Sequence, residues 1–241
     1  MNEEKMKIEV WSDVICPFCY IGKRHYEAAL KQFTDSSKVE LVWKSFQLDP
    51  DMPKDNGGRN AYQYLADRKG ITYEQSVAMH RNVIEMAKSC GLTYNYDKAV
   101  VANSFDAHRL LQFAKTKGLG DAMKELLFKS YFTEGKNIAD KTILKALAVS
   151  CGLPQQETEA VLNSKLYSEE VKMDIQEAEK IGVTGVPFFV FNRKYAVSGA
   201  QPVEAFLQTL KKSYAEWQMK NPSENLKVNE GKVCTPEKDC K

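Results

Sequence analysis

The sequence predicts an α/β fold in which a small sheet is interrupted by a large block of helices. Strand-like segments occur only towards the two ends of the chain, at residues 8–11 and 39–46 and again at residues 186–191 and 195–198. Residues from about 60 to 164 show helical patterns only. The hydrophobic fraction of 43% is enough for a packed core, which argues against a mainly disordered chain.

The first two strands and the helix between them form a β-α-β unit. A short apolar run at residues 8–11 precedes an amphipathic segment at residues 16–33, and β-branched and aromatic residues follow at residues 39–46. This crossover is just long enough to join two parallel strands. Pro50 and Pro53 then exclude both a helix and a central strand, so regular structure stops there.

Glycine residues punctuate the helical block. Five helical patterns end in glycine followed by an aliphatic residue, as expected for left-handed caps, at Gly70-Ile71, Gly91-Leu92, Gly118-Leu119, Gly152-Leu153 and Gly182-Val183. Thr72 and Gln75 have the spacing of a capping box. After a further helix at residues 166–181, the last two strands form a hairpin across a polar turn, and a final helix covers residues 201–219.

These patterns predict three parts of the chain. Residues 1–58 and 166–218 would form one domain that contains the sheet, and residues 59–165 would form a helical insertion. Residues 219–241 are rich in Asn, Pro, Ser, Glu, Lys and Gly, which is typical of a polar tail.

Charge and hydropathy exclude several classes of function. The 34 basic and 32 acidic residues leave a net charge of +2, which gives no support for nucleic-acid binding. No apolar run approaches the roughly 20 residues that span a bilayer. The charged N-terminus lacks the apolar core of a secretion signal, so we expect a cytoplasmic protein. In that compartment a dithiol is more often catalytic or metal-binding than structural.

Cys16 and Cys19 form a Cys-x-x-Cys motif at the start of the first helix. Pro17 suits the first helical turn, where N–H groups have no intrahelical partner. Those N–H groups and the positive end of the helix dipole favour an anion, so we predict that Cys16 is an activated thiolate and Cys19 the resolving thiol. Half of a zinc site and a structural disulfide are the alternatives.

Three polar residues are candidates for a supporting role. Asp13, three residues before Cys16, could relay protons to Cys19 or serve only in the turn. His108 and Arg109 of the helical block either approach the cysteine pair or make an ordinary contact between helices.

Four stretches of the chain resemble the DsbA-like branch of the thioredoxin superfamily, and within it the FrnE-type proteins. The similarity covers residues 6 to about 215, and the combination is more specific than any single piece. The stretches are Ser12-Asp-Val-Ile-Cys-Pro-Phe-Cys-Tyr-Ile-Gly22, Ala107-His-Arg-Leu110, Gly182-Val-Thr-Gly-Val-Pro-Phe-Phe-Val190 and Ser198-Gly-Ala-Gln-Pro202. The resemblance implies a thioredoxin fold with a large all-helical insertion.

The same resemblance implies roles for individual residues. Pro187 would be a cis proline that faces the cysteines, with Cys16 as the attacking thiol and Cys19 as the resolving thiol. A proline there stops normal strand pairing, so Val186 could bind an extended substrate segment by strand addition. An ordinary trans proline at the start of a strand is the alternative. We predict that Pro17 and Phe18 belong to the same substrate-binding surface.

Phe18 marks a departure from DsbA, which has a histidine between its two cysteines. Phenylalanine offers neither a donor nor a charge to a thiolate, so the reduced form should be less favoured here. A thiol pKa ~3 units above that of DsbA corresponds to about 4 kcal/mol, or on the order of 90 mV for a two-electron couple. We therefore expect a reductase or isomerase rather than a dedicated oxidant.

The tail carries a second pair, Cys234 and Cys240, and some FrnE-type proteins are similar in having one. A disulfide there would close a small ring and add only about 2 kcal/mol. A redox shuttle to Cys16 and Cys19 therefore explains the pair better than a structural role does. An incidental disulfide formed in air, and a zinc site shared with the first pair, stay open.

The sequence thus predicts a thiol–disulfide oxidoreductase or disulfide isomerase that works through a mixed disulfide. Its partners would be proteins that carry disulfides or thiols, with glutathione or thioredoxin as electron donor, and we expect no metal and no organic cofactor. Glutathione-dependent isomerases and transferases of the kappa type resemble this chain in architecture, but they generally lack a residue equivalent to Cys19. A redox-sensing, client-binding module is the non-enzymatic alternative.

Overall fold

The structure is a computed structural model, and it describes residues 4–52 and 60–220. The elements in chain order are β1 (Met6–Ser12), α1 (Pro17–Lys31), η1 (Ser36–Lys38), β2 (Val39–Ser45), α2 (Ala61–Lys69), α3 (Tyr73–Ser89), α4 (Phe105–Thr116), α5 (Gly120–Phe132), α6 (Lys141–Ser150), α7 (Gln155–Leu162), α8 (Ser168–Lys180), β3 (Phe188–Phe191), β4 (Tyr195–Ser198) and α9 (Val203–Lys220). The expected domain boundary near residue 58 and the pair Cys234 and Cys240 lie outside the described residues, and the domain division stays a prediction.

The described strands form one mixed sheet in the order β2-β1-β3-β4. β1 pairs in parallel with β2, and it pairs antiparallel with β3, which forms a hairpin with β4. The expected parallel pair and the expected hairpin are both confirmed. β3 begins at Phe188, later than the sequence indicated, so Val186 and Pro187 precede the paired part of the strand.

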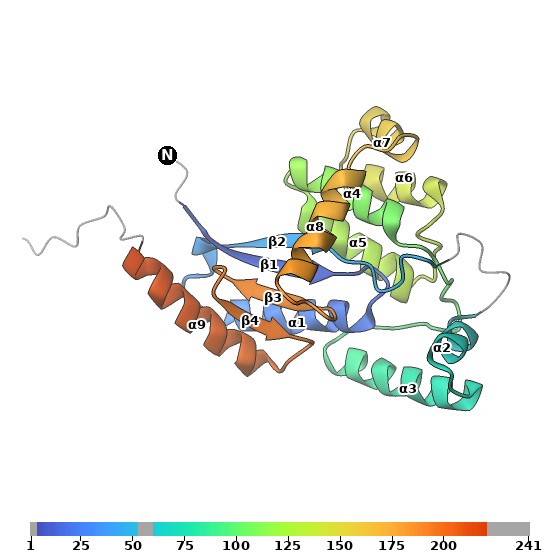
Figure 1. The fold of residues 1–241 in the computed structure, drawn as a ribbon, viewed down its shortest axis with the longest axis horizontal. Helices are drawn as coiled ribbons and strands as arrows, with labels where there is room; N and C mark the ends of the chain where they lie inside the picture. Colours follow the sequence, from blue (N-terminus) through green and yellow to red (C-terminus); the bar gives the residue numbers. More distant parts are fainter. Residues whose placement is uncertain (1–3, 53–59, 221–241) are drawn as a thin grey trace, which may run out of the picture.

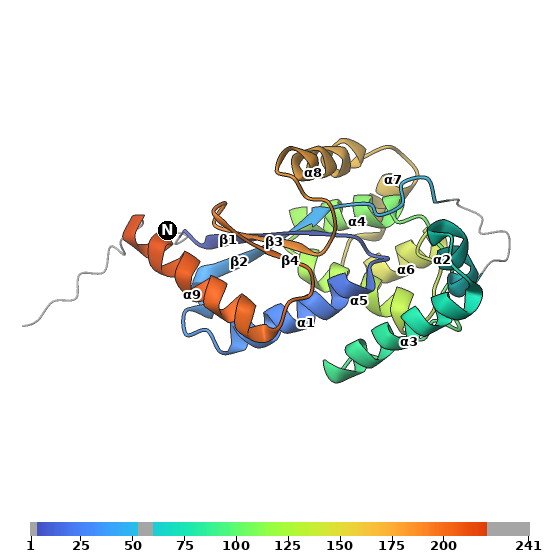
Figure 2. The same cartoon turned by 60° about the horizontal axis from the view of Figure 1, so that its bottom comes forward.

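Helices cover both faces of this sheet (Figures 1 and 2). α1 and α9 pack together on one face, and α8 lies on the other. Successive residues of a strand point to opposite faces. Ile8 and Val10 of β1 therefore join the core beneath α1 and α9, whereas Trp11 packs with Ala178 of α8. The central strand is thus buried on both sides, as an apolar run predicts.

Helices α2 to α7 gather at the end of the sheet where β1 leads into α1 (Figure 1). They pack in sequential pairs, α2 with α3, α4 with α5 and α6 with α7. The capping box of Thr72 and Gln75 is present, and the five expected glycine caps have positive φ angles. No helix among residues 4–52 and 60–220 is both long enough and apolar enough to cross a membrane.

α5 is held against both the sheet and α1 by polar contacts. Asp121 accepts a hydrogen bond from Trp43 Nε1 of β2 at 3.0 Å. Glu125 pairs with Lys23 at 2.9 Å and also with Arg24, both from α1. These contacts place one face of α5 beside the second turn of α1, one turn after the cysteine motif.

Candidate active site

Cys16 and Cys19 lie at the junction where β1 ends and α1 begins, as the sequence predicted. Cys16 is the N-cap residue, with an extended backbone (φ −87°, ψ 113°), and Pro17 is the first helical residue. The Cys19 N–H donates to the Cys16 carbonyl at 3.1 Å. Both side chains are free thiols, so this is the dithiol form of the pair.

The segment before β3 lies directly against this motif. The Cys16 thiol donates a hydrogen bond to the Val186 carbonyl at 3.4 Å, and the Val186–Pro187 peptide bond is cis. Gly22 of α1 approaches the same segment, because a Cβ atom there would lie 3.0 Å from Pro187 Cγ. The structure therefore brings together residues that are about 170 positions apart in the sequence.

The two thiols are enclosed, whereas the residue between them is open to solvent. Cys16 is 2% exposed and Cys19 is 0% exposed, but Phe18 is 38% exposed. Burial raises the pKa of the Cys16 thiol well above its usual range, and the adjacent Cys19 thiol contributes to the same effect. The expected resting thiolate is therefore not what the dithiol form holds.

The sizes of two opposing effects on the Cys16 pKa explain why the thiol is not the thiolate that the sequence predicted. A helix N-terminus stabilises an anion by about 0.3–2 kcal/mol, which is at most about 1.5 pKa units. Desolvation of a fully buried group shifts the pKa by up to about 3–5 units in the opposite direction. Burial wins at Cys16, whose proton is held by the Val186 carbonyl.

Asp13 and His108 form a buried polar pair next to the motif. Asp13 accepts a hydrogen bond from the Leu48 N–H at 2.7 Å, and its other carboxylate oxygen lies 3.2 Å from His108 Nε2. Burial works to raise the pKa of Asp13, but the contacts with His108 and Leu48 hold it below its usual value. Burial lowers the pKa of His108. The pair is therefore a carboxylate bound to a neutral imidazole.

The two residues of α4 for which the sequence left open an approach to the site or an ordinary contact between helices behave differently. His108 reaches Asp13, and Asp13 also accepts the Cys16 N–H through its backbone carbonyl at 3.2 Å. Arg109 instead donates to the backbone carbonyl of Leu166 at 2.8 Å and pairs with Asp106. It also donates to the Val161 carbonyl of α7, so it serves as a contact between helices.

Lys124 of α5 is a further buried charge at this site, and the sequence analysis did not single it out. It is 0% exposed, and its Nζ lies 3.5 Å from the Ser12 carbonyl. The Nζ also lies 4.7 Å from the ring centre of Phe128 and 5.3 Å from that of Trp43. Burial lowers the pKa of Lys124 to about 8, although the nearby cysteines and Asp13 act to raise it.

One sequence signal could have indicated Lys124. Helical residues three and four positions apart share a face, and this lysine interrupts an otherwise apolar or aromatic stripe on α5. The buried members of the stripe are Met123, Lys124, Leu127, Phe128 and Tyr131. A charged residue at such a position must find a buried partner or lose its charge.

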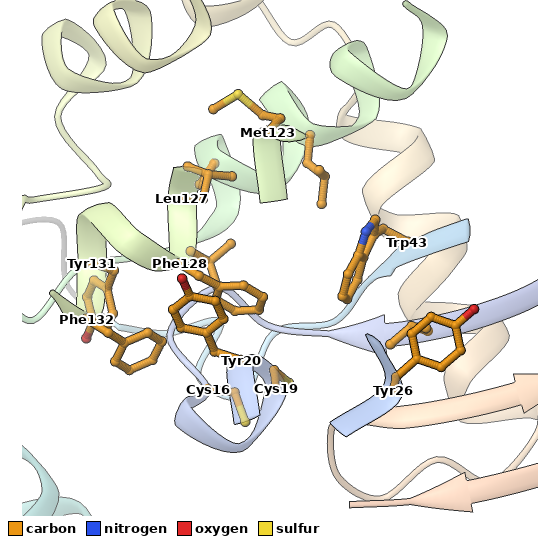
Figure 3. Close-up of a cluster of buried hydrophobic side chains, with 14 of the residues drawn as sticks. Cys16, Cys19, Tyr20, Tyr26, Trp43, Met123, Leu127, Phe128, Tyr131 and Phe132 are labelled. Atoms are coloured by element: carbon orange, nitrogen blue, oxygen red, sulfur yellow. The ribbon is translucent and has the colours of Figure 1, made fainter. Parts of the chain in front are cut away.

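Aromatic rings form the surroundings of the cysteines on the side of the helical block (Figure 3). Tyr20, next to Cys19, stacks on Phe128 with ring centres 4.8 Å apart. The Tyr94 hydroxyl donates a hydrogen bond to the Pro17 carbonyl at 2.7 Å. This bond links the helical block to the turn of the motif. No local pattern marks Tyr94, because its partner lies 77 residues earlier.

The described residues contain no cluster of three or more histidine, cysteine, aspartate or glutamate side chains that could hold a metal ion. The zinc alternative needs Cys234 and Cys240, which lie outside the described residues.

Comparison with known proteins places this fold in a family. Residues 7–211 match the model of the DSBA-like thioredoxin domain. YwbO of Bacillus subtilis, an uncharacterized protein, is 28% identical over 187 residues, which cover 76% of this chain and 85% of YwbO. The probable DsbA oxidoreductase SCO1869 from Streptomyces coelicolor has a crystal structure that is 37% identical and superposes with a TM-score of 0.80. That match covers 96% of this chain and 97% of SCO1869.

A more distant structure shares the fold alone. The cytosolic disulfide reductase DsbM from Pseudomonas aeruginosa with GSH is 16% identical, with a TM-score of 0.59 over 90% of this chain and 100% of DsbM. The narrower FrnE-type resemblance stays a prediction. The family model spans most of the sequence, and the chain therefore belongs to the family of DsbA-like thioredoxin domains.

Proposed function

We propose that this protein is a thiol–disulfide oxidoreductase that acts as a reductase or isomerase, with Cys16 as the attacking thiol. The placement of Cys16 carries the proposal. Its sulfur is at the start of α1, directed at the Val186 carbonyl 3.4 Å away, and Cys19 lies within the same helical turn. This arrangement supports two consecutive thiol–disulfide exchange reactions at the Cys16 sulfur.

In the first exchange, the Cys16 sulfur attacks one sulfur of a substrate disulfide. A bond forms between Cys16 and that sulfur, and the other substrate sulfur leaves as a thiolate. In the second exchange, the Cys19 sulfur attacks Cys16, the mixed disulfide breaks, and the second substrate thiolate leaves. Two electrons pass to the substrate, and Cys16 and Cys19 become a disulfide that an external thiol must reduce.

Two features support the reducing direction. Phe18 offers no charge or donor to a thiolate, and burial raises the pKa of the Cys16 thiol. DsbA is a strong oxidant because its reduced form is stabilised. A pair without that stabilisation gives up electrons more readily.

We further propose that the substrate lies across Phe18 and the segment before β3. Phe18 is among the exposed large apolar side chains, and Val186 is half-buried and precedes the paired residues of β3. An extended substrate segment could therefore pair with the Val186 backbone, as in strand addition.

Cys19 also bears on the kappa-type alternative. A glutathione-dependent isomerase or transferase needs no second thiol, whereas here Cys19 is buried beside Cys16.

We propose glutathione as the electron donor and the cytoplasm as the location. Both proposals are supported by DsbM, which is described as a cytosolic reductase and whose structure contains GSH.

Reduction of insulin by dithiothreitol tests the activity. We expect the wild-type protein to accelerate insulin precipitation and both Cys16→Ser and Cys19→Ser to lose that acceleration. Cys19→Ser should also accumulate a mixed disulfide through Cys16. Cys90→Ser, which replaces a half-buried cysteine elsewhere in the fold, is the matched control and should remain active. Equal client binding by all variants without turnover would instead support a binding module.

Titration in glutathione buffers tests the direction and the donor. We expect a reduction potential between those of thioredoxin and protein disulfide isomerase, about −270 to −180 mV. A potential as high as that of DsbA, about −120 mV, would contradict a reductase. Parallel turnover assays with reduced glutathione and with reduced thioredoxin then identify which thiol regenerates the pair.

A further inference from the structure

The segment after β2 is placed beside the cysteine motif by the register of the sheet. Ser45, the last residue of β2, lies opposite Ser12 at the end of β1, and Phe188 at the start of β3 lies opposite Trp11. The turn that leads to Cys16, the segment after β2 and the segment before β3 therefore leave the sheet at one edge (Figure 1). The proposed reaction uses the first and the third of these segments, and the second has no role in it.

Leu48 in this second segment is exposed, although its backbone is held on both sides. The residue is 39% exposed. Its N–H donates to the Asp13 carboxylate at 2.7 Å, and its carbonyl accepts a hydrogen bond from Arg68 of α2 at 2.6 Å. Asp13 in turn accepts the Cys16 N–H through its own carbonyl at 3.2 Å. One residue, Asp13, thus fixes the backbone of both Cys16 and Leu48.

The residues that follow are also held, so the exposure of Leu48 does not come from a loose segment. The Asp49 carboxylate accepts a hydrogen bond from the Tyr64 hydroxyl of α2. Asn103, close to the start of α4, donates through its side-chain amide to the Met52 carbonyl at 2.8 Å. The Met52 side chain is itself buried. Contacts from two helices therefore hold an apolar side chain in water at a fixed position, as is typical of loops that bind a ligand.

The same segment shares an apolar area with Val186. Phe46 and Val186 are both half-buried, and both pack against the small cluster that contains Trp11. Val186 is also the residue whose carbonyl accepts the Cys16 thiol at 3.4 Å. Leu48 follows Phe46 by two residues, which is at most about 7 Å of chain. These side chains therefore border one apolar area next to the attacking sulfur.

Phe18 lies on the other side of the motif. It belongs to α1, which covers one face of the sheet, whereas the Trp11 cluster includes Ala178 of α8 on the opposite face (Figure 2). Cys16 thus lies between an exposed apolar residue of α1 and the apolar area that ends at Leu48. Single exposed apolar residues are common on protein surfaces. Leu48 differs from them because it is anchored to the residue that also anchors the attacking cysteine.

We propose that Leu48 contacts an apolar side chain next to the disulfide of the substrate, and that the protein therefore prefers disulfides in apolar segments. This inference rests on the proposed function. The substrate is a polypeptide whose sulfur lies at Cys16, whose backbone pairs with Val186 and whose neighbouring side chain contacts Leu48.

The substrate class follows from this contact. Apolar side chains are mostly buried in folded proteins, so a disulfide with an apolar neighbour is accessible mainly in a chain that has not completed folding. Incompletely folded proteins that carry disulfides are therefore the preferred substrates. Small disulfides without such a side chain gain nothing from Leu48.

Two peptide disulfides test the proposal on the full-length chain. Each is a short peptide whose central cysteine is joined to thionitrobenzoate, and the residues on both sides of that cysteine are leucine in one peptide and serine in the other. The Cys16 sulfur attacks the peptide sulfur, the bond to thionitrobenzoate breaks, and thionitrobenzoate leaves as a coloured thiolate. The other four cysteines are replaced by serine in a reference protein, and its Cys16→Ser form gives the background rate.

We expect the reference protein to react about fivefold faster with the leucine peptide than with the serine peptide. A factor of five corresponds to about 1 kcal/mol, which the burial of about 40 Å² of apolar surface supplies. Leu48→Ala and Leu48→Asn should bring the ratio of the two rates close to one, and the conservative change Leu48→Met should retain it.

Leu166→Ala is the matched control. Leu166 is also an exposed leucine outside a helix, and its backbone is also held, with its N–H bound to Ser164 and its carbonyl bound to Arg109. It lies in the connection between α7 and α8 rather than beside the motif. This variant should keep the fivefold preference.

Each other outcome has a distinct meaning. Equal rates with the two peptides in the reference protein, or a preference that persists in both the alanine and the asparagine variants, would overturn the inference and leave the proposed function standing. Equal slowing with both peptides in the Leu48 variants would assign Leu48 a purely structural role and would also overturn it. If the reference protein reacts no faster than its Cys16→Ser form, the proposed function fails, and the inference fails with it.

Discussion

Burial of the charged Lys124 amine should lower the stability of the protein, and denaturation can measure this effect separately from activity. Burial lowers the pKa of Lys124 from 10.5 to about 8. At about 1.4 kcal/mol for each pKa unit, the folded state binds the proton of Lys124 about 3 kcal/mol more weakly than the unfolded chain does. The ring contacts with Phe128 and Trp43 offset part of this loss. We therefore expect a penalty of about 1–3 kcal/mol.

The sign of the penalty follows from the two pKa values. Below pH 8 both states are protonated, and the unfolded state binds the proton more tightly, so the penalty is fully present. It declines as the pH rises from about 8 to 10.5, and it vanishes when neither state holds the proton. Lys124→Met should therefore raise the free energy of unfolding at pH 7 and have little effect near pH 10.5.

Urea denaturation at pH 7 and pH 10 measures this difference. Serine at positions 16 and 19 in both proteins removes the titration of the thiols. Lys23→Met is the control: burial acts to lower the pKa of Lys23, but its carboxylate partners raise that pKa above the usual value. A raised pKa contributes stability below the unfolded value, so this variant should be less stable at pH 7. A Lys124→Met protein that is less stable than its parent at pH 7, or whose advantage does not vary with pH, would refute the reasoning.

Three further changes test other contacts of the site. Gly22→Ala places a Cβ atom 3.0 Å from Pro187 Cγ. The helix gains about 0.5–1 kcal/mol of stability, but overpacking against Pro187 costs about 1–3 kcal/mol, so denaturation should show a small net loss of stability. Insulin reduction should slow by about tenfold. Tyr94→Phe removes the 2.7 Å hydrogen bond to the carbonyl of the half-buried Pro17, and urea denaturation should show a loss of about 0.5–1.5 kcal/mol, the usual net contribution of one hydrogen bond. His108→Gln should reduce the loss of unfolding free energy that occurs as the pH falls from 7 to 5. Burial lowers the pKa of His108 in the folded state, so the unfolded chain binds the proton more tightly and acid favours unfolding.

Each of these changes has its own control. Gly120→Ala introduces a contact of 2.9 Å with Lys115 Cγ outside the site, and it should leave insulin reduction unchanged. Full activity of Gly22→Ala would show that the close approach of Gly22 to Pro187 does not contribute to insulin reduction. Phenylalanine at position 94 keeps the stack on Phe132, so an unchanged stability would mean that the hydroxyl contributes nothing. The pH dependence left in the His108 variant should come from His80, whose pKa burial also lowers.

The features that the sequence determined are those that depend on near neighbours in the chain. Pro17 suits a first helical turn whatever surrounds it, and Cys16 and Cys19 share one turn because of their spacing alone. Thr72 and Gln75 form their capping box across three positions, and the β3–β4 hairpin closes over a short turn. Interactions of this kind involve only a few torsion angles, so local residue preferences are sufficient to predict them.

The charge state of the site was decided only by the tertiary structure. Lys124 and His108 come from the helical block and enclose a motif about 100 positions earlier in the chain. No residue within the motif reveals that enclosure. Desolvation acts more strongly on a thiol than the helix terminus does. For that reason the same Cys-x-x-Cys sequence, expected to carry a thiolate, holds a neutral thiol when α4, α5 and the Val186 segment close around it.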